Sequence, residues 1–107
     1  MAKGFARALI VGFLISGAPA SAETSDAENF DLACAVTGSA EIAKDSSEET
    51  KRIYRPMINF YLGRLSIRNE KLPWSAMVDE LVRDRLDKPA LTDFLKECMD
   101  LYTRKTQ

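Results

Sequence analysis

Apolar residues recur every three or four positions along most of the chain after residue 30, which is the spacing of one face of an α-helix. Short polar segments interrupt this pattern three times. We therefore predict four helices, at about residues 31–44, 48–68, 73–86 and 89–103. The fold class that follows is all-α, a small four-helix bundle over residues 30–103. Residues 23–29 are expected to form a flexible acidic lead-in, and residues 104–107 a frayed tail.

The second predicted helix is apolar around much of its circumference. Its apolar residues lie on more than one side, so we expect it to be the most buried element, held inside the bundle. Ser46 and Glu49 are spaced as a capping box at its start. Pro56 removes an internal hydrogen bond and clashes with the preceding turn. Either the helix kinks there, or a short helix ends and the main one begins at Pro56, and we favour the second interpretation.

Prolines also mark the starts of the last two predicted helices. Pro73 suits the first turn of the third helix, and Asp87 can cap a fourth that has Pro89 in its first turn. Trp74, at the start of the third helix, has two interpretations. It either packs over the edge of the core or serves as an exposed binding anchor.

Gly63 stands in the interior of the second predicted helix, where glycine costs about 1 kcal/mol relative to alanine. A compensation is therefore expected, namely the close approach of a neighbouring helix or of a dimer partner. Arg64 and Arg68 follow one turn apart. Residues 23–49, the first third of the chain after the predicted signal peptide, carry eight acids and one base. The two arginines are therefore available for ion pairs with acids of that first third.

The first 22 residues have the pattern of a secretory signal peptide. Lys3 and Arg7 precede a short apolar run, and the small residues 20–22 resemble a signal-peptidase site. The run is shorter than the roughly 20 residues of a stable membrane span. A retained membrane anchor is the alternative. We expect cleavage after Ala22, no stable membrane anchor, and a periplasmic or secreted protein.

The chain has two cysteines, Cys34 and Cys98, and export would carry both into an oxidising compartment. A disulfide between them would close a loop of about 64 residues and stabilise the fold by roughly 4 kcal/mol. The alternative is a reactive thiol, which normally needs a histidine as its base. The sequence contains no histidine and no C-x-x-C motif. The pattern therefore predicts a structural disulfide that clamps the bundle.

The absence of histidine also excludes a Ser-His-Asp triad and the usual zinc sites. Paired carboxylates do occur in the sequence, but each lies beside basic residues on a predicted solvated helix face. We therefore expect no enzymatic activity, no catalytic residues, no cofactor and no metal. Bases and acids are interleaved after residue 50, which makes a nucleic-acid partner improbable.

The segment RPMINFYLGRL, together with an early Cys34 and a late Cys98, resembles the HdeA/HdeB group of periplasmic acid-stress chaperones. Pro56 and the segment 61–65 would be the counterparts of that group's central helix. The chain also resembles uncharacterised small exported proteins of alphaproteobacteria that share a YLGRL segment. The resemblance implies a small disulfide-bonded helical fold and a role in the stress response.

The function implied by the resemblance is binding of unfolding envelope proteins in acid. Positive self-repulsion would loosen the bundle, while the disulfide limits its unfolding. A homodimer near neutral pH is possible in that group. The candidate interaction surface consists of Tyr61, Leu62, Gly63, Leu65 and Trp74. The alternative function is that of a folded interaction module or inhibitor subunit that binds a partner protein of the cell envelope.

Overall fold

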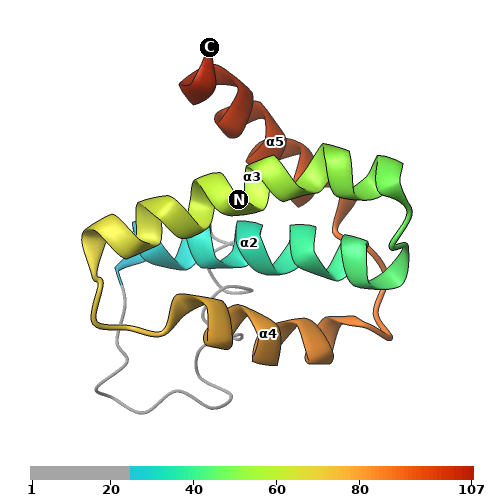
Figure 1. Ribbon diagram of the computed structural model, residues 1–107, viewed down its shortest axis with the longest axis horizontal. Helices are drawn as coiled ribbons and strands as arrows, with labels where there is room; N and C mark the ends of the chain where they lie inside the picture. Colours follow the sequence, from blue (N-terminus) through green and yellow to red (C-terminus); the bar gives the residue numbers. More distant parts are fainter. Residues whose placement is uncertain (1–24) are drawn as a thin grey trace.

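The computed structural model describes residues 25–107, which form four α-helices and, within that range, no strand. The helices are α2 (Asp26–Lys44), α3 (Glu48–Arg68), α4 (Trp74–Arg85) and α5 (Thr92–Thr106), shown in Figure 1. The predicted all-α, four-helix fold is confirmed. The predicted signal peptide and its cleavage site lie outside the described residues.

Helix α2 begins at Asp26, five residues earlier than predicted. Ser25 and Glu28 form a capping box, in which the Ser25 hydroxyl accepts from the Glu28 amide at 3.2 Å and the Ser25 amide donates to the Glu28 carboxylate at 3.0 Å. The expectation of a flexible lead-in is therefore wrong from Asp26 onward. The segment is polar throughout, so its hydrophobic pattern does not predict a helix. The helix starts here because of the hydrogen bonds between Ser25 and Glu28.

Helix α3 has the predicted bounds but is continuous through Pro56, so the predicted break at that residue is wrong. Arg52 and Pro56 are both exposed. The Arg52 carbonyl, to which proline cannot donate, therefore lies on the solvent side, where water can bond it. The cap also differs from the prediction, because the Ser47 hydroxyl, rather than that of Ser46, accepts from the Thr50 amide at 3.2 Å.

Helix α5 begins at Thr92, so neither Asp87 nor Pro89 starts it as predicted. The carbonyls of Lys88 and Pro89 accept instead from basic side chains, Lys44 Nζ at 2.6 Å and Arg85 Nη2 at 2.8 Å. These bonds hold the chain between α4 and α5 in an extended path. At the other end, α5 continues through Thr106, so the expected frayed tail is also wrong.

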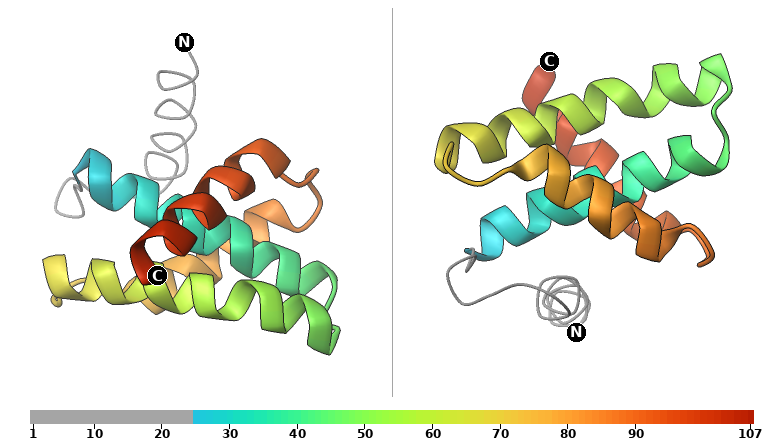
Figure 2. Two further views of the ribbon diagram at one scale, coloured as in Figure 1. Left: turned by 90° about the horizontal axis from the view of Figure 1, so that it is seen from above. Right: turned by 60° about the horizontal axis from the view of Figure 1, so that its bottom comes forward.

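The central helix of the bundle is α2. It lies between α3 and α4, and α5 crosses it at a steep angle, as the views of Figures 1 and 2 show. Every residue from 31 to 38 is buried. The prediction that α3 would be the most buried helix is therefore wrong. Small side chains such as Ala33, Ala35 and Gly38 let three helices approach α2 closely, whereas arginines, glutamates and Asn59 keep one side of α3 in solvent.

Helix α3 contributes one face to the core, through Met57, Ile58, Tyr61 and Leu65. The glycine that permits a close helix contact is Gly38, on α2. A Cβ atom there would lie 2.8 Å from Met57 Cε and 3.0 Å from Ile58 Cγ1. At Gly63 a Cβ atom would meet nothing within 4 Å. The expected close approach of a neighbouring helix at Gly63 is therefore wrong.

The predicted disulfide joins Cys34 of α2 to Cys98 of α5, with their Cα atoms 5.6 Å apart and both residues fully buried. It links the central helix to the helix that crosses it. Among residues 25–107, no helix has the length and apolar character needed to cross a membrane.

Candidate functional site

The residues of the candidate interaction surface do not form one surface in the folded molecule. Tyr61 and Leu65 are fully buried, Leu62 is half-buried and Gly63 is exposed. Trp74 is buried, and its indole nitrogen donates to the Asn69 carbonyl at 2.8 Å. Of the two interpretations of Trp74, packing against the core is therefore confirmed.

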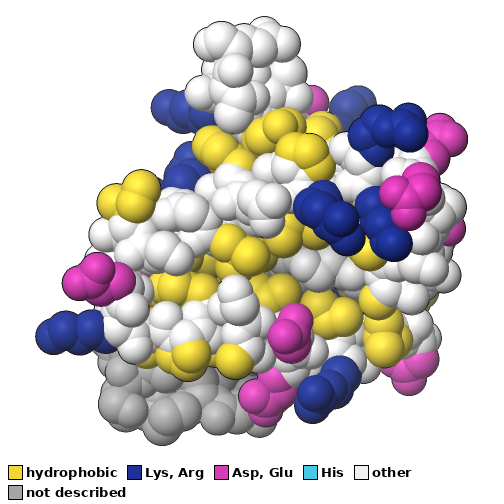
Figure 3. Space-filling model, in the orientation of Figure 1, with side chains coloured by type: hydrophobic (Ala, Val, Ile, Leu, Met, Phe, Trp, Pro, Cys, Tyr) yellow, Lys and Arg dark blue, Asp and Glu magenta, His cyan; other side chains and the backbone are white. Residues whose placement is uncertain are grey.

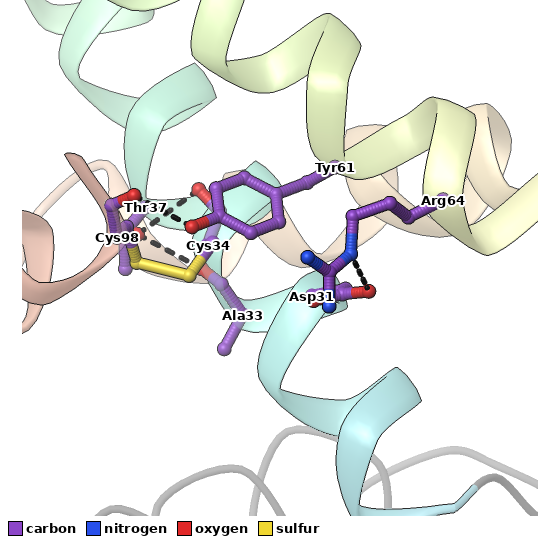
Figure 4. Close-up of a disulfide and its surroundings, with 7 residues drawn as sticks. All are labelled: Asp31, Ala33, Cys34, Thr37, Tyr61, Arg64 and Cys98. Carbon is purple, nitrogen blue, oxygen red and sulfur yellow. Dashed lines mark hydrogen bonds and ion pairs between the residues drawn. A yellow bond between two sulfur atoms is a disulfide. The ribbon is translucent and has the colours of Figure 1, made fainter. Parts of the chain in front are cut away.

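An ion cluster connects the central helix to α3 (Figure 4). The Asp31 carboxylate is fully buried, and its Oδ2 atom lies 3.1 Å from Arg64 Nε and 3.8 Å from Arg68 Nη1. The two arginine side chains are 27% and 37% exposed. The prediction that these arginines would meet an acid of the first third is thus confirmed.

The second carboxylate oxygen of this cluster, Asp31 Oδ1, is buried and has no hydrogen-bond partner in the described residues. Burial raises the pKa of the Asp31 carboxyl above its ordinary value of 3.8, and the charge of Arg64 opposes that rise only in part. Keeping the Asp31 carboxyl ionised at neutral pH therefore reduces the free energy of unfolding.

An aromatic cluster surrounds Arg64 on the side of α3 that faces α5. Phe60 contacts Tyr61 and Tyr102 edge-on, with ring centroids 5.0 and 5.4 Å apart. The Arg64 guanidinium lies 5.3 Å from the centroid of the Phe60 ring, within the range of a cation–π contact. Phe30 of α2 extends this cluster by edge contacts with Tyr61 and with Phe94 of α5.

Tyr61 connects the aromatic cluster to the disulfide. Its hydroxyl donates to the Cys98 carbonyl at 2.6 Å, and burial raises the pKa of this phenol. Thr37, also near the disulfide, satisfies its buried hydroxyl by donating to the Ala33 carbonyl at 2.8 Å. The polar groups drawn in Figure 4 thus bond three helices to one another.

Sequence reasoning missed Asp31 as the centre of this site, because it took the residue as the start of a helix. A signal existed, since Asp31 is the one charged residue between Phe30 and Val36 and precedes Cys34 by three positions, on the same side of the helix. Among residues 25–107, no group of three or more histidines, cysteines, aspartates or glutamates is placed to hold a metal ion. The arrangement can pair charges and bury apolar surface.

A second feature is the solvent-facing side of α3, which we call the outer stripe: Ile53, Pro56, Phe60, Gly63 and Ile67. The side chain of Ile67 is 87% exposed and that of Ile53 is 48% exposed. In Figure 3, lysine and arginine side chains lie over α3 beside hydrophobic ones. This stripe combines exposed apolar residues with positive charge.

Comparison of this chain with protein families, with curated proteins and with solved structures finds no match.

Proposed function

We propose that the protein is an acid-conditional chaperone of the cell envelope, folded near neutral pH and opened in strong acid to bind unfolding proteins. The charge balance carries this proposal. A chain that begins at Glu23 holds 16 carboxylate side chains and 13 of the 15 basic ones, since Lys3 and Arg7 precede it. Protonation of the carboxylates leaves those bases without compensation, and their repulsion disfavours a compact domain.

The disulfide supports the same proposal. If repulsion separates the helices, the Cys34–Cys98 bond keeps α5 joined to α2, so the opened chain remains constrained and able to refold. Separation of α5 from α3 uncovers Tyr61 and the aromatic cluster around it. Separation of α3 from α2 uncovers Met57 and Leu65. These side chains supply the apolar surface that an unfolding client requires.

Asp31 acts against opening as the pH begins to fall. A carboxyl whose pKa is raised by folding binds protons more tightly in the folded state, so its contribution to stability increases as the pH falls towards 3.8. Asp31 therefore opposes opening in mild acid. Opening comes from the general repulsion at lower pH, once most of the exposed carboxylates are neutral.

The test measures dye binding and client protection at about pH 7 and about pH 2.5, where the exposed carboxylates are neutral. We expect the purified protein to bind a dye specific for apolar surface, and to suppress aggregation of an acid-denatured client, only at the lower pH. Leu62→Gln should weaken protection. Leu86→Gln, which removes an equal apolar side chain at the end of α4, is the matched control. A protein that stays compact and binds no dye at the lower pH would contradict the proposal.

The exposed outer stripe favours a second function, in which the folded molecule is an interaction module at neutral pH. Ile67 and Ile53 are the exposed apolar residues of α3. Trp74 is buried and does not serve as the anchor of such a module. Variants of the stripe that no longer bind a partner protein at neutral pH, but still protect a client in acid, would separate the two functions.

A further inference from the structure

The outer stripe of α3 has a regular spacing, and within this chain only Phe60 of the stripe packs against the core, through the aromatic cluster. Ile53, Phe60 and Ile67 are seven residues apart, with Pro56 and Gly63 between them, so all five lie along one side of the helix. The core of the bundle takes the opposite side of α3, through Met57, Tyr61 and Leu65. Phe60 is half-buried, so the apolar side chains that the stripe directs at solvent are Ile53, Pro56 and Ile67.

Positive charge accompanies the stripe along its whole length. From Thr50 to Arg68, helix α3 contains five basic residues and no acidic one. Lys51 pairs with Glu48, while Arg64 and Arg68 share Asp31. Arg52 and Arg55 are exposed and have no ion pair within the described part of the chain.

The positions of these bases put charge on both edges of the stripe. Arg52 precedes Pro56 by four residues, and Arg64 follows Phe60 by four, so guanidinium groups flank the apolar side chains. Gly63 adds no side chain at the middle of the stripe, and a Cβ atom there would lie in open space. A flat partner can therefore approach the backbone of α3 closely at that turn.

We propose that the outer stripe of α3 is a peripheral docking surface for a bilayer that contains anionic phospholipid. The bilayer interface accepts apolar side chains at the level of the acyl boundary and cations at the level of the phosphates, which is the arrangement along α3. A second copy of the chain fits less well. Packing two such helices against each other would bring together the basic residues of both copies, of which Arg52 and Arg55 have no ion pair within the described residues.

This docking needs the folded protein at neutral pH, and it is independent of client binding in acid. With two free arginines and two exposed isoleucines, the surface holds the protein at the membrane reversibly. Each basic residue near an anionic surface increases the partition coefficient about five-fold at moderate salt, and the attraction falls off within a Debye length.

The experiment is sedimentation of the full 107-residue chain with vesicles at pH 7. One set of vesicles is pure phosphatidylcholine, and the other contains about one third phosphatidylglycerol, so that only the second carries the surface charge. We expect stronger binding to the anionic vesicles, reversed when salt is raised to about 0.5 M. Any contribution of residues 1–24 is the same in every variant, so the differences between variants carry the test.

Two pairs of variants separate charge from apolar insertion. Arg52→Glu with Arg55→Glu should reduce binding at least 25-fold, while Arg83→Glu, an exposed arginine of α4, should reduce it at most five-fold. Ile67→Ser should reduce binding about ten-fold, and Leu86→Ser, at a 45% exposed position directly after α4, should reduce it far less. All five substituted positions are exposed, and circular dichroism checks that each variant is folded.

Three results would overturn the proposal. The first is equal binding to neutral and anionic vesicles. The second is an effect of Arg83→Glu as large as that of the double α3 variant. The third is a dimer in sedimentation that Ile67→Ser dissociates without any lipid binding, which would assign the stripe to a second copy of this chain.

Discussion

The hydroxyl of Tyr61 donates a 2.6 Å hydrogen bond to the carbonyl of Cys98, the residue whose sulfur is bonded to Cys34. A side chain of α3 thereby bonds to α5 at the same residue that joins α5 to the central helix. Three helices meet at this point, which is fully buried.

Substitution of Tyr61 by phenylalanine should reduce the free energy of unfolding by about 1 kcal/mol, because it removes this hydrogen bond and keeps the ring. Urea denaturation at pH 7 measures the change. Tyr102→Phe is the matched control, since the Tyr102 ring also contacts Phe60 but its residue is only half-buried. Equal effects of the two substitutions would show that the bond to Cys98 contributes nothing specific.

Replacement of both Cys34 and Cys98 by alanine should reduce the free energy of unfolding by roughly 4 kcal/mol, since the disulfide constrains a long loop of the unfolded chain. Alanine leaves no unsatisfied polar group in the core. Hydrogen exchange should show α5 losing protection before α2, because the disulfide attaches α5 to the central helix. A loss below about 1 kcal/mol would mean that the packing around Tyr61 suffices.

Asp31→Asn should change how stability depends on pH. Because folding raises the pKa of Asp31 above 3.8, its stabilising contribution is fully present below that value and is lost as the pH rises through the folded pKa. The wild type should therefore gain stability relative to Asp31→Asn as the pH falls from 7 to about 4. Denaturant titrations at several pH values measure this difference, and a constant difference would contradict the prediction.

Asp45→Asn provides a control of opposite sign. Hydrogen bonds from Thr50 and Ser47 lower the pKa of the Asp45 carboxyl. Its contribution is therefore present above its ordinary value of 3.8 and is lost as the pH falls through the lower folded pKa. The wild type should lose its advantage over Asp45→Asn in acid, in the same titrations.

Gly63→Ala and Gly38→Ala should differ in sign. At Gly63 the new methyl group enters open space in a helix, so stability should rise by roughly 0.5 to 1 kcal/mol. At Gly38 it would lie 2.8 Å from Met57 Cε, in a core where Met57 is fully buried. The destabilisation from crowding should exceed the gain from higher helix propensity, so the free energy of unfolding should fall by about 1 kcal/mol. Thermal unfolding of the two variants compares them directly.

Several features of this fold follow from local sequence. The four helices are predictable because the period of apolar residues and the intervening polar segments depend on neighbouring residues. The disulfide is predictable because Cys34 and Cys98 are the only two cysteines. The pairing of Arg64 and Arg68 with an acid of the first third follows from the uneven distribution of charge, although the sequence does not single out Asp31.

The helix starts were less predictable, because each depends on a particular set of bonds. Ser25 and Glu28 begin α2 inside a segment that is polar throughout. Pro89 does not start α5, and its carbonyl instead accepts a hydrogen bond from Arg85. Pro56 stays within α3 because its side of the helix faces water. In each case the amino-acid composition predicted a different helix start or end from the one observed. A particular hydrogen bond, or the exposure of one side of a helix, accounts for the difference.

The sequence by itself determined the all-α class, the helices and the covalent bond between Cys34 and Cys98, because those depend on local period and on a count of residues. Only the tertiary structure decided which helix is central, that Asp31 carries the buried charge, and that Gly38 rather than Gly63 permits close packing. These depend on how the side-chain volumes of several helices fit together at once. The helix predicted to be most buried is not the most buried one, because small residues let α2 be surrounded while the arginines of α3 keep its outer stripe in solvent.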